Sequence, residues 1–343
     1  MLVKKLFAYL FLLIGTAALV TAPAVPIMSK IWKWNSEHGM NDKWYGKHNS
    51  GWGDLANMAY LDCVPEFQEG YTYDFKHPEN DSVKNIALYL IGDSYTELVP
   101  GFAFAHTHSF QYSHNSKQFK YTLDTSKKNV LLIEITERFV INLLRGRDFF
   151  DTSAQNSSLS KGGDGKKNFG AIMNKNLEYL LLDYNLFNDV KFAKAKFNYR
   201  VFGRASGDVA LSENKKYLFF KPTVSRQGIF SSYAPVADTQ INYLVSTLNY
   251  IHSFYQDQGF EEVILTIIPS PASILQPANY NQMIPRLQER SDLEMPFVDL
   301  YSIFSNAQQP ERIYRVGDTH WNNKGMQLWL GLINDRLSVI SSR

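Results

Sequence analysis

Residues 85–99, NIALYLIGDSYTELV, join an apolar run to a Gly-Asp-Ser motif. The segment 85–92 is a short, almost continuous apolar run, which is typical of a strand buried on both faces of a parallel sheet. Gly-Asp-Ser follows, so Ser94 lies where reactive groups gather in open α/β sheets, at the carboxyl end of a strand. The residues after Ser94 could open a helix, whose N–H groups would stabilise an oxyanion. Gly-Asp-Ser is equally common in plain turns, and this motif alone leaves both interpretations open.

Further apolar runs and amphipathic segments continue the pattern along the chain. Strands are predicted at 129–136 (NVLLIEIT), 262–271 (EVILTIIPSP) and 296–304 (PFVDLYSIF), and helices at 238–260 and 326–340. Asp238 can cap the first helix and Gly259 lies past its end. Strands that alternate with helices predict an α/β fold, a three-layer sandwich around a mostly parallel sheet.

The first 29 residues are predicted to be a signal anchor or a signal peptide. Lys4 and Lys5 precede an uncharged apolar stretch, which is typical of an exported segment whose basic end stays in the cytoplasm. The stretch of ~20 residues is long enough to span a bilayer, which favours an anchor. Ala22-Pro23-Ala24 offers a cleavage site for the alternative, a secreted protein. The sequence therefore predicts a periplasmic protein held in the inner membrane by its N-terminal helix.

Two other segments do not follow the alternation of strands and helices. Residues 30–84 are polar and aromatic without a clear period, and we interpret them as a juxtamembrane lead-in to a catalytic domain at 85–343. Residues 145–235 are predicted to be an insertion in that domain. It begins with a polar loop at 145–168 and continues with two predicted strands of a subsidiary sheet, at 196–203 and 216–224.

Net charge and cysteine content exclude few classes of function. The formal net charge is +2, too small to indicate a nucleic-acid partner. One cysteine permits no intramolecular disulfide, which leaves the redox compartment open. No cofactor is predicted.

A second motif, YRVGDTHWNNKG at 314–325, supplies what a lone serine lacks. In an extended segment Asp318 and His320 point to the same face. The carboxylate can then accept a hydrogen bond from one imidazole nitrogen. The other nitrogen is left to take the proton of a serine. Asn322 or Asn323 can cap the helix that follows, and Gly325 permits a close approach of the chain. A metal pair or a solvated loop is the alternative interpretation of Asp-x-His.

The two motifs together resemble the first and last blocks of the SGNH/GDSL hydrolase superfamily. The form Asp-x-His-Trp is similar to the alginate O-acetyltransferase branch (AlgJ/AlgX-like, DHHW-type), and VLLIEITERFV at 130–140 is similar to a strand with a Glu-Arg ending in that branch. The superfamily usually has Asp-x-x-His, and the alginate enzymes place their Asp-x-His before the serine. The resemblance implies Ser94 as nucleophile, His320 as general base and acid, and Asp318 as the orienting carboxylate.

The resemblance also implies donors to an oxyanion and contacts to substrate. The N–H of Ser94 would be one donor, and Tyr95, Arg138, Gln111 and Trp321 are candidates by position. A salt bridge or a packing role is the simpler interpretation of Arg138. His106, His108 and His114 could form a metal site, although loop or packing histidines are the default and no metal is predicted.

The implied function is O-acyl transfer, in particular O-acetyl transfer to a cell-surface or exported polysaccharide. Such an enzyme would receive its acyl group from a membrane-bound acyltransferase. The alternatives are a carbohydrate acetylesterase with the same triad and a non-catalytic glycan-binding scaffold of an export complex.

Overall fold

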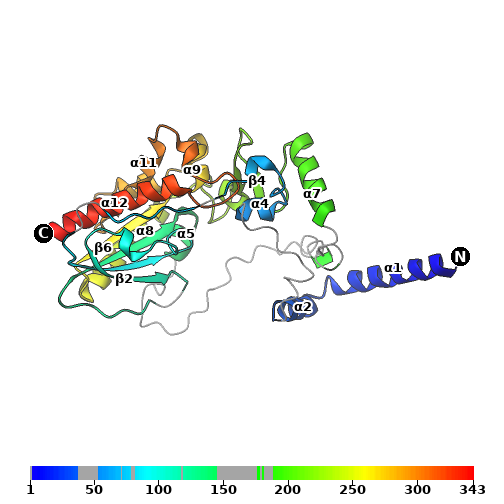
Figure 1. The fold of residues 1–343 in the computed structure, drawn as a ribbon, viewed down its shortest axis with the longest axis horizontal. Coiled ribbons are helices and arrows are strands. Elements are labelled where there is room, and N and C mark those ends of the chain that lie inside the picture. Colours follow the sequence, from blue (N-terminus) through cyan, green and yellow to red (C-terminus); the bar gives the residue numbers. More distant parts are fainter. Residues whose placement is uncertain are drawn as a thin grey trace.

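The structure is a computed structural model of the chain (Figure 1). It describes residues 2–37, 53–70, 72–78, 82–116, 119–144, 176–177, 180 and 188–343. The polar loop predicted at 145–168 lies outside the described residues.

A five-stranded sheet forms the centre of the fold, in the order β2-β1-β3-β6-β7. The strands are β1 (Ile86–Gly92), β2 (Thr107–His114), β3 (Lys128–Thr136), β6 (Glu262–Ile268) and β7 (Phe297–Val298). Every neighbouring pair is parallel, and all residues of β1 are buried, as its unbroken apolar run predicts. The strand order reverses between β1 and β3, and ligands bind at such a switch point in open α/β sheets.

Long helices cover the two faces of this sheet. Tyr89 on β1 and Phe110, which registers with Leu88, point to opposite faces because side chains alternate along a strand. On one face, Tyr89 contacts Phe260, which contacts Tyr255 of α8 (Asp238–Asp257). On the other face, Phe110 contacts Phe104, which contacts Trp329 of α12 (Asn323–Ser342). The prediction of an α/β fold with a mostly parallel sheet is confirmed.

Both predicted helices are present, α8 with the expected glycine after its end and α12 with an expected asparagine as its cap. Asn322 caps α12 by accepting from the N–H groups of Lys324 and Gly325. A Cβ on Gly325 would lie 2.7 Å from the carbonyl oxygen of Ile313, so only glycine allows this approach. Gly259 follows α8 at a φ of 100°, whereas the N-cap of α8 is Ala237 and not Asp238.

Two strand predictions need correction. The segment 296–304 is a strand only at Phe297–Val298, after which Asp299 caps α11 (Leu300–Ser305) by accepting from Ser302 N–H. Residues 196–203 are helical and not a strand, since α7 (Asn188–Phe197) continues into a π-helix (Asn198–Phe202) that ends at Gly203 with a φ of 57°. The apolar residues of this segment, Phe197, Val201 and Phe202, are exposed and bury no strand face.

The lead-in and the insertion pack together beside the main sheet. β4 (Val209–Leu211) and β5 (Leu218–Phe220) form an antiparallel pair, which places a strand within the predicted 216–224 segment. Leu55 of α4 (Asp54–Met58), with Phe67 of a 3-10 turn (Pro65–Phe67), shares a small core with Val209 and Leu218. The described lead-in residues 54–67 are therefore part of the folded body.

Shorter elements complete the chain. They are α5 (Glu137–Leu143), α9 (Pro271–Leu275), α10 (Met283–Gln288) and the 3-10 turns Gly101–Ala103, Lys221–Val224, Pro277–Asn279 and Pro310–Arg312.

The N-terminal segment forms α1 (Leu2–Thr21) and α2 (Val25–Glu37). Within the part of the chain that the structure describes, no helix has both the length and the apolar character needed to cross a membrane. The predicted N-terminal membrane helix stays a prediction.

Candidate active site

Asp93 builds the turn that presents Ser94 at the end of β1. Its Oδ1 accepts from the N–H of Tyr95 at 2.9 Å, and its carbonyl oxygen accepts from the N–H groups of Thr96 and Glu97, each at 3.1 Å. Residues 94–98 are a turn and not the start of a helix, which corrects the sequence expectation. Among the described residues no acceptor lies on the N–H of Ser94, so this group is free to donate to an oxyanion.

A buried carboxyl group on the neighbouring strand supports this turn. Oε2 of Glu134 on β3 accepts from the N–H of Asp93 at 2.9 Å and from Oγ1 of Thr96 at 3.0 Å. Burial raises the pKa of Glu134 well above its usual range, and the nearby Asp93 raises it further. Gly92 is required here, because a Cβ would lie 2.2 Å from Thr96 Oγ1. A single Glu inside an apolar strand is the sequence signal that could have identified this residue.

Ser94, His320 and Asp318 lie in hydrogen-bonded order. Ser94 Oγ is 2.8 Å from His320 Nε2, and His320 Nδ1 is 2.6 Å from Asp318 Oδ1. The contact with a carboxylate places the imidazole proton on Nδ1, which leaves Nε2 free to accept from the serine hydroxyl. Ser94 is exposed, whereas the side chain of His320 is 20% exposed and that of Asp318 is 5% exposed. Solvent therefore reaches these three hydrogen-bonded side chains only from the serine end.

Asp318 is held ionised in a buried position. Its Oδ2 accepts from Arg315 at 2.5 Å, and both side chains are almost fully buried. Burial pushes the pKa of Asp318 upward, but its hydrogen bond to His320 and the charges of His320 and Arg315 outweigh that effect and lower the pKa to about 2. Arg315 was not foreseen from the sequence, although a cation three residues before Asp318 was a visible signal.

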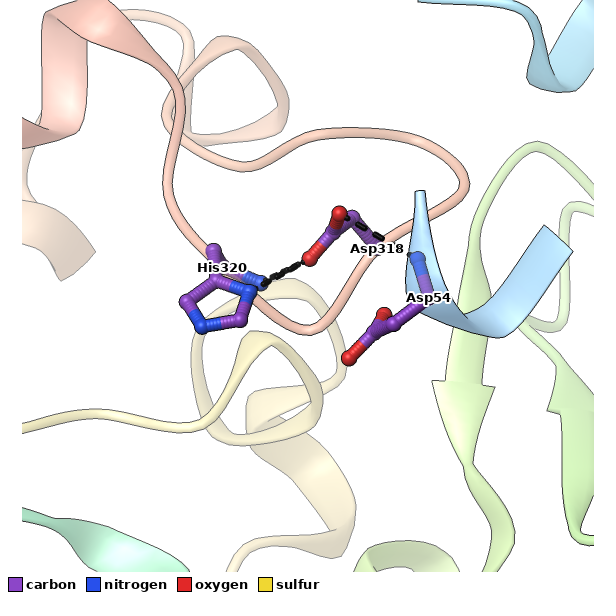
Figure 2. A group of neighbouring side chains, drawn as sticks. All are labelled: Asp54, Asp318 and His320. Atoms are coloured by element: carbon purple, nitrogen blue, oxygen red, sulfur yellow. Dashed lines mark hydrogen bonds and ion pairs between the residues drawn. The ribbon is translucent and has the colours of Figure 1, made fainter. Parts of the chain in front are cut away.

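Asp54, from the predicted lead-in, reaches the same loop (Figure 2). Its two carboxylate oxygens accept from the N–H of Thr319 at 2.9 Å and from Thr319 Oγ1 at 2.7 Å. Its own N–H donates to Asp318 Oδ2 at 3.3 Å. Desolvation of this carboxylate raises its pKa, and the adjacent charge of Asp318 raises it further. No sequence signal marks Asp54, because it lies 264 residues from its partners.

Asp54, Asp318 and His320 also form the one group of ligand-type side chains in the described residues that could share an ion. All four carboxylate oxygens already accept hydrogen bonds, from Thr319, His320, Arg315 and the N–H of Asp54. A cation would have to displace these donors and sit beside the guanidinium of Arg315. The occupied oxygens favour a hydrogen-bonded network over a metal centre.

The predicted aromatic residues lie beneath the site. The N–H of Tyr95 is taken by Asp93, so it is no oxyanion donor, and the Tyr95 hydroxyl donates to the carbonyl of Thr319. The Tyr95 ring lies 4.6 Å from the His320 ring, centroid to centroid. Trp321 is fully buried between Tyr95 and Trp329, which places it in the core and away from any substrate surface.

Arg138 and Gln111 differ in their relation to the site. Arg138 lines a pocket with Tyr95, Thr319, Ser270 and Phe220, and its guanidinium lies 5.0 Å from the ring centroid of Phe139. No carboxylate within the described ranges pairs with Arg138. Gln111 registers with Tyr89, well before the end of β1, and its amide donates to the carbonyl of Lys120. The structure does not bring Gln111 to Ser94.

The three histidines of 106–114 lie along the edge strand and its entry. His106 Nδ1 lies 3.0 Å from the carbonyl oxygen of Val83, and His114 Nδ1 accepts from Ser116 Oγ at 2.8 Å. His108 and His114 are six positions apart on β2, about 20 Å at the rise of a strand. They cannot bind one ion together.

Glu137, at the start of α5, is another buried carboxyl group, and sequence analysis singled it out only as part of a resemblance. Its Oε2 accepts from Ser270 N–H at 2.8 Å and from Ser273 Oγ at 2.7 Å. Burial raises the pKa of Glu137 to about 7, although these hydrogen bonds lower it. The bonds join α5 to the turn after β6, which borders the same pocket as Arg138.

We expect the substitution Glu137→Gln to change how stability depends on pH. A folded-state pKa of about 7, above the unfolded value of about 4.3, means that the native state binds the extra proton. This contribution is fully present below about pH 4 and is lost as pH rises through about 7, by roughly 3–4 kcal/mol. Urea unfolding from pH 4.5 to 8 should show wild type losing stability relative to the variant. The exposed Glu261→Gln is the control, and a pH-independent difference for Glu137→Gln would contradict the assignment.

The structure thus brings together the three residues on which the two sequence motifs depend, while their catalytic roles stay a prediction. The resemblance to the SGNH/GDSL superfamily likewise stays a prediction. No protein-family model, no characterised protein and no solved structure matches this chain.

Proposed function

We propose that the protein is an extracytoplasmic, serine-dependent O-acyltransferase of SGNH type, which transfers an acetyl group to a hydroxyl of a cell-surface or exported polysaccharide. The observation that carries the proposal is the contact of 2.8 Å between Ser94 Oγ and His320 Nε2, backed by the bond of 2.6 Å from His320 to Asp318. A nucleophile, a base and an orienting group in that order are the elements of acyl transfer through a covalent intermediate.

The first half of the reaction acylates Ser94. His320 Nε2 takes the proton of the hydroxyl as Oγ bonds to the acyl carbonyl, and the Ser94 N–H faces the oxyanion that forms. The tetrahedral intermediate then breaks its bond to the leaving oxygen, which receives the proton from His320. Asp318 stabilises the imidazolium in both steps because it stays ionised down to a pH near 2.

The second half reverses these movements with a sugar hydroxyl. His320 takes the acceptor proton, the acceptor oxygen bonds to the acyl carbon, and the bond to Ser94 Oγ breaks as Oγ recovers its proton. Water in place of the sugar hydroxyl would give an esterase. The exposure of Ser94 favours this second candidate, because water reaches the same position as an acceptor.

Export and the acyl donor belong to the same proposal. Lys4, Lys5 and the apolar residues after them support an exported segment at 1–29, either a signal peptide or an anchor. A periplasmic enzyme has no access to cytoplasmic acyl carriers, so a membrane-bound acyltransferase would supply the acyl group. Mass spectrometry of the mature N-terminus separates the two forms of the leader, since a start at Val25 shows cleavage.

The function is tested with p-nitrophenyl acetate as donor, with and without a panel of purified neutral and uronate oligosaccharides. Release of p-nitrophenol together with an acetylated oligosaccharide in the mass spectrum supports the transferase. Release that gives only acetate supports the esterase. Absence of both release and acetylation of Ser94, with oligosaccharide binding retained, would overturn the enzyme and leave the scaffold.

A further inference from the structure

The loop that carries Asp318 and His320 is held from outside the α/β sheet. The chain enters and leaves it through the bridge between Tyr314 and Trp321, and the N–H of Arg315 donates to the carbonyl of His320 at 3.2 Å. Beyond that bridge, the backbone groups at 316 and 317 bond to other segments. Val316 N–H donates to Glu69 Oε2 at 2.9 Å, and Val316 O accepts from Leu218 N–H at 2.9 Å.

The start of α4 lies against the tip of this loop. Gly317 O accepts from the N–H of Ala56 at 2.9 Å. Gly53 adopts a φ of 111°, and a Cβ there would lie 2.4 Å from Gly317 O. A side chain at position 53 would therefore prevent this close approach of the two segments. Figure 2 shows Asp54 projecting from α4 toward Asp318 and His320.

Asp54 contacts the loop at three points on two adjacent residues. Its carboxylate accepts from both the N–H and the hydroxyl of Thr319, and its N–H donates to the Asp318 oxygen that does not face His320. Thr319 lies between Asp318 and His320 in the chain, so fixing it sets the direction of both neighbouring side chains. Asp54 makes no hydrogen bond or ion pair with Ser94, so its effect on the serine passes through the loop.

We propose that Asp54 is a positioning residue, which holds the Asp318–Thr319–His320 loop in the arrangement that lets His320 reach Ser94. The inference rests on the proposed function and deepens it, because it makes the segment before the α/β domain part of the catalytic apparatus. The charged groups that face Asp54 are Asp318 and His320, with Arg315 on the far side of Asp318. A positioning role needs no titration of Asp54 and no bound ion.

The test compares Asp54→Ala, Asp54→Asn, Thr319→Val and the double variant Asp54→Ala/Thr319→Val in the p-nitrophenyl acetate assay. Asp54→Ala should lower kcat by about tenfold to a hundredfold, because displacement of a reacting group by about 1 Å has effects of this size. KM should be unchanged, since Asp54 acts on the serine through its bonds to the loop. The double variant should be no slower than Asp54→Ala, because both substitutions remove one shared interaction.

A structural role alone would not move the second readout, the far-downfield proton resonance of His320 Nδ1–H bonded to Asp318. We expect that resonance to be broadened or lost in Asp54→Ala and retained in the control Asp257→Asn, an exposed carboxylate near the end of α8. Asp54→Asn keeps the size of the side chain and Thr319→Val keeps the backbone bond. These two variants carry the comparison if Asp54→Ala does not fold.

Wild-type kcat and an unchanged resonance in Asp54→Ala would overturn the inference, as would rate losses that add fully in the double variant. If Ser94→Ala retains turnover, the proposed function fails, while the resonance still reports whether Asp54 positions His320. If Ser94→Ala is inactive and the Asp54 variants match wild type, only the positioning role fails.

Discussion

Ser94→Ala is expected to lower kcat with p-nitrophenyl acetate by about 10⁶-fold, the loss seen when a nucleophilic serine is removed from a triad. The variant keeps His320 and Asp318 but has no atom that can form the acyl-enzyme. The main readout is kcat, and the second is the mass of the protein after a brief reaction, which should show one acetyl group on wild type and none on the variant.

The loss should occur without loss of fold. The side chain of Ser94 is exposed and its hydroxyl bonds to His320, so removing it should change the free energy of unfolding by no more than about 1 kcal/mol. Ser246→Ala on α8 is the matched control, because that hydroxyl is also exposed and bonds only to Tyr243 of its own helix. Full turnover in Ser94→Ala, or acetylation at another residue, would remove the nucleophile from the proposal.

Asp318→Asn is expected to lower kcat by about 10⁴-fold, as the loss of the orienting carboxylate does in a Ser-His-Asp triad. An amide facing Nδ1 can donate, which favours the imidazole tautomer that carries its proton on Nε2. His320 would then present a proton to Ser94 in place of a lone pair. The measurement is kcat across pH 5 to 9, with Asp335→Asn on α12 as an exposed control.

The same substitution should also lower stability. It leaves the buried guanidinium of Arg315 without its carboxylate, and breaking a buried ion pair destabilises by about 3–5 kcal/mol. The folded pKa of Asp318, about 2, lies below the unfolded value of about 3.9. Its stabilisation is therefore present above about pH 4 and is lost as pH falls toward 2. Asp318→Asn should lack this acid limb in urea unfolding, and an unchanged limb would show that another group titrates there.

How far sequence predicted the fold depends on how each segment is buried. Strands covered on both faces have unbroken apolar runs, and 85–92 and 129–136 were recognised for that reason. β2 lies at the edge of the sheet and none of its residues is fully buried. Its sequence THSFQYSH therefore has no unbroken apolar run and does not predict a strand. The exposed phenylalanines Phe197 and Phe202 led to the opposite error, because they predicted a strand at 196–203 where the chain is helical.

The local chemistry of this protein follows from its sequence: an apolar strand ending in Gly-Asp-Ser, and an aspartate two residues before a histidine, with the capped helix that follows. The remote groups that complete these motifs are known only once the chain is folded. Glu134 beneath the turn and Asp54 on the opposite side of the loop act through contacts between segments far apart in the chain, whereas Arg315 lies three residues before Asp318. Periodicity records whether a residue is buried, but not which partner meets it, because the partner is chosen by packing of the whole chain.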